Sequence, residues 1–165
     1  MNPPGANEPL PYFAYGSNMW APQMEERCPG STVIGLAQLA GYRFLINSRG
    51  YATVTALSPL SPLSPTSGVE MTVHGVLWRV SDGNMAKLDR YEGVADGRYL
   101  REKVALSRSA TTTAAPGEAI EAIVYRDPIT TTGPPRPGYL ERVVNGATAE
   151  GIPERYIEEV LRRCF

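Results

Sequence analysis

The stretch Pro11-Tyr12-Phe13-Ala14-Tyr15-Gly16-Ser17-Asn18-Met19 decides the fold that we expect of this chain. Its aromatic part, Tyr12 to Tyr15, has the composition of a β-strand. Gly16 tolerates backbone angles closed to other residues, and Ser17 and Asn18 favour turns and helix caps, so the strand ends there. A strand that runs into such a turn directs consecutive backbone N–H groups at one point. The stretch therefore predicts a site for a carboxylate or an oxyanion, with a core strand and a plain polar turn as the alternative.

A second stretch, Leu88-Asp89-Arg90-Tyr91-Glu92-Gly93-Val94, predicts a carboxylate at the end of a helix. Ser81 or Asp82 can cap this helix, and Gly93 can end it in a left-handed turn. The C-terminal end of a helix repels negative charge, and the flanking tyrosine and valine offer apolar surface. Both effects raise the pKa of a carboxyl group, which suits Glu92 to proton transfer near neutral pH. An exposed glutamate in a helix-stop turn is the alternative interpretation.

The length and composition are those of one domain with a sizeable core, since the 165 residues are 42% hydrophobic. A formal net charge of −1 gives no sign of nucleic acid or an anionic membrane as a partner. We find no apolar run long enough to span a membrane and no signal peptide in the first ten residues. We expect a flexible tail over residues 1–9 and a single domain over residues 10–165.

The cysteine and histidine content argues against two classes of site. Cys28 and Cys164 are the only cysteines, so a disulfide scaffold is not expected and a reducing cytoplasm is the natural location. His74 is the only histidine, which leaves too few soft ligands for a His/Cys metal site. We therefore expect neither a metal nor another cofactor.

The order of strands and helices predicts a mixed α+β fold. Runs rich in β-branched and aromatic residues predict strands at 12–15, 32–39, 41–47, 51–57, 71–80, 99–106 and 119–126. Short helices are expected after Asn18, from residue 81 to Gly93, over 139–145 with a stop at Gly146, and over 154–163. The Ser-Pro repeat at 58–65 predicts an extended surface loop. A small, strongly curved or closed β-barrel of about six or seven strands, flanked by these helices, fits best.

Three separated motifs resemble the gamma-glutamylcyclotransferase family, which has the AIG2-like fold. The first is the opening stretch at 12–19, and the second is the stretch at 88–94 with the following Gly97-Arg98-Tyr99. The third combines Pro137-Gly138-Tyr139 with the glycine-containing segments at 146–147 and 151–156. The motifs occur in order over most of the chain, which makes the resemblance specific.

The resemblance implies which residues form the site. The strand end and turn, formed by Tyr12, Phe13, Ala14, Tyr15, Gly16, Ser17 and Asn18, correspond to the family segment that holds the amino acid head of a γ-glutamyl group. Glu92 corresponds to the catalytic glutamate, Tyr139 to a tyrosine near the pocket, and Tyr99 is a weaker candidate for lining it. The family also leaves a homodimer open.

The family reaction closes a ring. The α-amine of the substrate attacks its own γ-carbonyl, which gives 5-oxoproline and a free amine or amino acid. Because the nucleophile is tethered to the electrophile, the enzyme needs no serine or cysteine nucleophile and no cofactor. It does need a group that carries protons from one nitrogen to the other, and one carboxyl group with a raised pKa can do this.

Three questions stay open at the level of sequence. A serine hydrolase that pairs Ser17 with His74 lacks the Gly-x-Ser-x-Gly turn that would present the serine. A non-catalytic module that binds a γ-glutamyl ligand is a second alternative, because a fold does not determine a function. The leaving group is also undecided among γ-glutamyl amino acids, γ-glutamyl amines and a γ-glutamyl-protected biosynthetic intermediate.

Overall fold

The computed structural model describes residues 9–57, 71–109 and 117–164. The expected tail, apart from Pro9, and the whole Ser-Pro repeat at 58–65 lie outside these residues. The division into a tail and one domain therefore stays a prediction.

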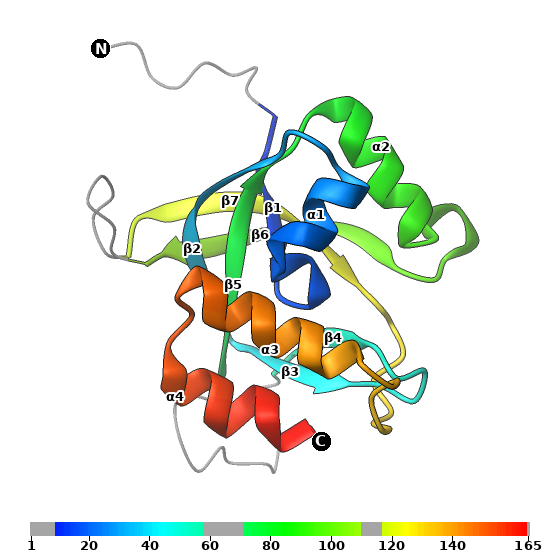
Figure 1. Ribbon diagram of the computed structural model, residues 1–165, viewed down its shortest axis with the longest axis vertical. Helices are drawn as coiled ribbons and strands as arrows, with labels where there is room; N and C mark the ends of the chain where they lie inside the picture. Colours follow the sequence, from blue (N-terminus) through cyan, green and yellow to red (C-terminus); the bar gives the residue numbers. More distant parts are fainter. Residues whose placement is uncertain (1–8, 58–70, 110–116, 165) are drawn as a thin grey trace.

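A closed five-stranded barrel forms the centre of the fold (Figure 1). Its strands are β1 (Tyr12–Ala14), β2 (Thr32–Ala40), β5 (Thr72–Arg79), β6 (Leu100–Arg108) and β7 (Ala119–Arg126), in the order β1-β5-β2-β6-β7. The short strand β1 closes the barrel, since it pairs antiparallel with β5 on one side and parallel with β7 on the other. This arrangement confirms the expected mixed α+β fold with a closed barrel.

Two further strands, β3 (Tyr42–Ile46) and β4 (Ala52–Ala56), form a separate antiparallel sheet. The described residues thus contain seven strands, as expected, but the barrel itself has fewer. Gly41, with a φ of 78°, separates β2 from β3 and lets the chain leave the barrel there.

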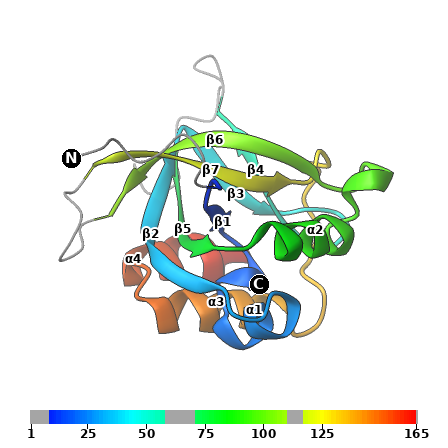
Figure 2. The ribbon, with the colours of Figure 1, turned by 90° about the horizontal axis from the view of Figure 1, so that it is seen from above.

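Helices cover the outside of the barrel. They are α1 (Ala21–Arg27), α2 (Asp82–Tyr91), α3 (Tyr139–Glu150) and α4 (Glu154–Tyr156), and the helical path of α4 continues to Cys164. Figure 2 shows α1, α3 and α4 together on one side of the molecule, with β6 and β7 on the opposite side. None of the helices in the described ranges is long and apolar enough to cross a membrane.

The start and end of α2 follow the local signals in the sequence. The Ser81 hydroxyl accepts a hydrogen bond from the Asn84 backbone N–H at 3.2 Å, which caps the helix. Gly93 adopts the left-handed conformation, with a φ of 66°, directly after the helix. These two residues place Glu92 at the C-terminal end of α2, as predicted.

Two helix predictions are wrong. Asn18 caps no α-helix, because α1 begins only at Ala21 and the Asn18 side chain is buried instead. The third helix does not stop at Gly146 but continues to Glu150, and Gly151 ends it. Gly146 serves close packing, since a Cβ atom there would lie 2.5 Å from the Trp20 backbone nitrogen. The missing side chain lets α3 lie directly against the chain that follows β1.

Candidate active site

A cavity of about 220 Å³ opens where β1 ends in the Gly-Ser-Asn turn. Its walls include the following residues named from the sequence: Tyr12, Tyr15, Gly16, Ser17, Asn18, Glu92, Tyr99 and Tyr139. The structure therefore brings together the turn and the glutamate, which are far apart in the sequence.

Phe13 and Ala14 are not among the residues that line the cavity. Phe13 is fully buried, and its ring lies against Gly75 of β5, where a Cβ atom would come within 2.5 Å of it. Ala14 pairs with Val76 in the ladder between β1 and β5. Both residues are part of the barrel wall that supports the site.

Side chains of α1 hold the turn in place. The Gln23 amide donates hydrogen bonds to the Ser17 hydroxyl at 2.7 Å and to the Asn18 side-chain oxygen at 2.8 Å. Arg27 donates to the same Asn18 oxygen at 3.0 Å. Asn18 in turn donates to the Tyr12 hydroxyl at 3.0 Å. The network joins strand, turn and helix, and neither Gln23 nor Arg27 was expected from the sequence.

Glu92 lines the cavity from the end of α2 and is partly buried. Burial raises the pKa of its carboxyl group to about 7, and the positive charges of Arg27 and Arg49 only partly oppose this. Tyr91, expected to flank it with apolar surface, lines the same cavity, although its side chain is 54% exposed and lies under the Arg27 guanidinium at 5.0 Å.

Two tyrosines bind the same backbone position on β4. The Tyr99 hydroxyl donates to the Ala52 carbonyl at 3.1 Å, and the Tyr139 hydroxyl accepts from the Ala52 N–H at 3.3 Å. The Tyr139 oxygen also lies only 3.1 Å from the position of a Cβ atom at Gly16, so a side chain there would crowd it. Burial raises the pKa of both hydroxyl groups, so they stay protonated at neutral pH.

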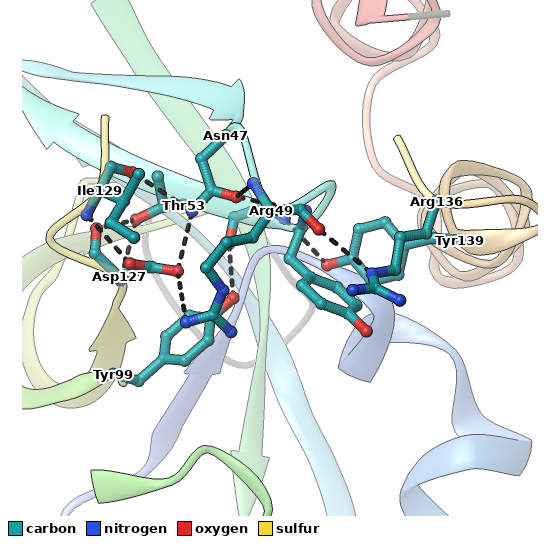
Figure 3. A network of polar contacts seen from close by, with 10 residues as sticks. Asn47, Arg49, Thr53, Tyr99, Asp127, Ile129, Arg136 and Tyr139 are labelled. Atoms are coloured by element: carbon teal, nitrogen blue, oxygen red, sulfur yellow. Dashed lines mark hydrogen bonds and ion pairs between the residues drawn. The ribbon is translucent and has the colours of Figure 1, made fainter. Parts of the chain in front are cut away.

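A buried polar network positions Arg49 at the cavity (Figure 3). Asp127, with no exposed side-chain surface, pairs with Arg49 at 3.4 Å and accepts a hydrogen bond from Asn47 at 2.8 Å. The Ile129 backbone N–H donates to the other carboxylate oxygen at 2.9 Å. Arg136 donates to the Arg49 carbonyl at 3.2 Å. These contacts hold the loop between β3 and β4 beside the site.

The cavity is rich in positive charge. Arg27, Arg49, Arg98 and Arg142 line it, and among the described residues Glu92 is the one acidic side chain that does so. Such a cavity favours an anionic ligand. Arg98 stands in a motif that already pointed to the site, whereas the other three arginines lie in stretches without a recognisable pattern.

The remaining sequence hypotheses concern metals and a serine nucleophile. The described residues contain no group of three histidine, cysteine or acidic side chains placed to hold a metal ion. His74 packs against Tyr156, with ring centroids 4.7 Å apart, and does not line the cavity that contains Ser17. The pair that a serine hydrolase would need is therefore not formed.

Known proteins share both sequence and fold with this chain. Residues 72–160 match the AIG2-like family. Gamma-glutamylcyclotransferases from Bos taurus and Homo sapiens are each 29% identical to it, over 88% and 90% of this chain and 73% and 76% of theirs. A solved gamma-glutamyl cyclotransferase superposes with a TM-score of 0.73 at 26% identity, covering 93% of this chain and 86% of its own. A human protein described as uncharacterized superposes with a TM-score of 0.76 at 26% identity, with 94% and 88% covered. The chain belongs to the AIG2-like family.

Proposed function

We propose that this protein is a gamma-glutamylcyclotransferase that releases 5-oxoproline from a γ-glutamyl compound. The observation that carries the proposal is the position of Glu92, a carboxyl group with a pKa of about 7, in one cavity with the Gly16-Ser17-Asn18 turn. The relatives that bear the name gamma-glutamylcyclotransferase support this class of activity.

In the proposed complex the amino acid head of the substrate binds at the turn. Backbone N–H groups at the end of β1 are suited to its carboxylate, and α1 fixes the turn through Gln23 and Arg27. A fixed turn favours the bent conformation in which the α-amine reaches the γ-carbonyl. Orientation of this kind supplies much of the acceleration in a ring closure.

Glu92 carries the protons in this mechanism. Its carboxylate accepts a proton from the α-ammonium group, and the freed amine attacks the γ-carbonyl carbon. The protonated carboxyl group then donates to the leaving nitrogen as the bond between that nitrogen and the γ-carbon breaks. The attacking nitrogen loses two protons overall and the leaving amine gains two, so the carboxylate is regenerated. A pKa of about 7 suits both roles near neutral pH.

Tyr139 is our candidate for stabilising the oxygen that becomes negative during the attack. Its hydroxyl accepts from the Ala52 N–H and is also hydrogen-bonded to Ser17 of the turn, so its O–H lies beside the place where the head of the substrate would bind. Burial keeps the hydroxyl protonated at the pH at which Glu92 works. A donor already held in place is the usual way in which enzymes stabilise such an oxyanion.

The charge of the cavity favours a leaving group that carries a carboxylate. Arg49, Arg98 and Arg142 line the same cavity as Glu92, in addition to Arg27 beside the turn. A γ-glutamyl amino acid brings two carboxylates into this environment, whereas a γ-glutamyl amine brings one. We therefore place γ-glutamyl amino acids before the other γ-glutamyl compounds.

Product formation tests the proposal. The protein is incubated with γ-glutamyl-alanine, and 5-oxoproline is measured for the wild-type protein and for the Glu92→Gln variant. We expect release by the wild type and a loss of about 10²–10⁴-fold in the variant, the usual contribution of a general acid–base group. Calorimetric binding of γ-glutamyl-alanine to the wild type without any product would instead support a non-catalytic binding module.

A further inference from the structure

A second hollow is lined mainly by residues of α1 and α2, two helices that lie near each other in Figure 1. It has a volume of about 520 Å³ and is lined by Glu26, Arg27, Pro29, Lys87, Arg90 and Tyr91. The two helices are joined at its edge by a hydrogen bond from the Asn84 side-chain amide to the Pro29 carbonyl at 3.0 Å. We call this hollow the α1–α2 groove.

The α1–α2 groove adjoins the active-site cavity at two shared residues. Arg27 and Tyr91 line both, and the Arg27 guanidinium lies over the Tyr91 ring at 5.0 Å. Glu92 follows Tyr91 directly, so the reacting bond of a bound substrate would lie next to this pair. A leaving group directed away from the Gly-Ser-Asn turn can therefore pass over Arg27 and Tyr91 into the groove.

The sizes of the two spaces make such an extension necessary for larger substrates. The cavity of about 220 Å³ is smaller than the roughly 300–1,000 Å³ that sites for small molecules usually provide. It is suited to a γ-glutamyl head and a small leaving group. The side chain of a longer leaving amino acid needs further room, and the groove offers it.

The groove carries a surplus of positive charge. Its lining contains three cationic side chains, Arg27, Lys87 and Arg90, and one acidic side chain, Glu26. Lys87 and Arg90 are three residues apart on α2, so their side chains lie on the same face of the helix. No ion pair is formed by either of them within the part of the chain that the structure describes. Both cations are available to an anionic ligand.

We infer that the α1–α2 groove is a subsite for an acidic side chain on the leaving amino acid. The preferred substrates are then γ-glutamyl dipeptides whose second residue carries a carboxylate, such as γ-glutamyl-glutamate. Lys87 and Arg90 bind this additional carboxylate, and Glu26 limits its affinity by repulsion. The inference rests on the proposed cyclotransferase activity and adds a specificity to it.

Two substrates of nearly equal shape test the subsite. γ-Glutamyl-glutamate and γ-glutamyl-glutamine differ in the charge of one side chain, so the ratio of their kcat/KM values isolates the effect of that charge. We expect a ratio of about 5–10 in favour of γ-glutamyl-glutamate at low salt, the effect of two exposed charge contacts. The Lys87→Glu/Arg90→Glu variant should bring the ratio below one, and Glu26→Gln should raise it.

Lys103 provides the matched control, because the chain contains only two lysines and Lys103 is exposed on β6, outside the groove. Lys103→Glu changes the net charge by the same amount per site and should leave the ratio as in the wild type. A wild-type ratio of one, or a ratio that Lys103→Glu lowers as much as the double variant does, would overturn the subsite while the cyclotransferase activity stands. Absence of 5-oxoproline from both substrates, with γ-glutamyl-alanine still turned over, would overturn the subsite alone, and its absence from all three would overturn the proposed function as well.

Discussion

Glu92 should make the folded protein less stable as the pH rises, and Glu92→Gln should remove this effect. The carboxyl group has a pKa of about 7 in the folded protein, against an ordinary value of 4.5. A raised pKa means that folding favours the protonated form, so the associated stability is fully present below pH 4.5. It is lost as the pH rises toward 7, where the folded protein must also ionise this group.

The magnitude follows from the two pKa values. Raising the pKa from 4.5 to about 7 penalises the ionised form by about 3 kcal/mol, since one pKa unit corresponds to about 1.36 kcal/mol. Glutamine has nearly the shape of the protonated carboxyl group and does not ionise. The Glu92→Gln variant should therefore match the wild type at pH 4 and be up to about 3 kcal/mol more stable at pH 8.

Urea unfolding of both proteins at pH 4 and pH 8 measures this difference. Any effect of the amide itself on stability is the same at both pH values. It therefore cancels when the difference between variant and wild type at pH 4 is subtracted from the difference at pH 8. Glu121→Gln, at an exposed position on β7, is the control, and its difference in stability from the wild type should be the same at the two pH values. A Glu92→Gln variant that is no more stable than the wild type at pH 8, after subtraction of the pH 4 value, would refute the enclosure of Glu92.

Three further predictions concern the supporting structure. Gly146→Ala should lower the melting temperature, because its Cβ atom would lie 2.5 Å from the Trp20 backbone nitrogen. The control Gly83→Ala on α2 has no atom within 4 Å of its Cβ position and should raise the melting temperature, because alanine has a higher helix propensity than glycine. Equal shifts of the two variants in thermal unfolding would contradict the packing role of Gly146. Asp127→Ala should cost about 3 kcal/mol in urea unfolding, since the buried Asn47 amide and the Ile129 N–H lose their acceptor and Arg49 loses its ion-pair partner. A cost below about 1 kcal/mol would show that water replaces the carboxylate. Gln23→Leu should lower kcat/KM for γ-glutamyl-alanine about tenfold, because it frees the turn that binds and orients the head; an unchanged kcat/KM would argue against this positioning role.

The parts of the fold that the sequence predicted well depend on local signals. The cap at Ser81 and the left-handed turn at Gly93 are set by the residues themselves, so the position of Glu92 at a helix end was predictable. Gly146 shows the limit of such signals. Glycine ends helices and also permits close packing, and only the tertiary contact of α3 with the Trp20 backbone decides between the two.

The charged part of the site could not be predicted for a related reason. Arg27 lies at the end of α1, Arg49 in the loop between β3 and β4, and Arg142 on α3, and nothing in the sequence links these elements. Arg49 reaches the cavity because Asp127, far along the chain, holds its loop. Long-range contacts of this kind have no signature in a single sequence, whereas the turn at Gly16 and the helix end at Glu92 do.

The pH dependence of kcat/KM for γ-glutamyl-alanine tests most directly whether an enclosed carboxyl group moves the protons. Glu92 must be ionised to accept the first proton, so kcat/KM for the wild type should rise about tenfold per pH unit below pH 7 and level off above it. Glu92→Gln should show low activity without this rising limb. A rising limb near pH 4.5 in the wild type, or one near pH 7 that persists in Glu92→Gln, would contradict the mechanism.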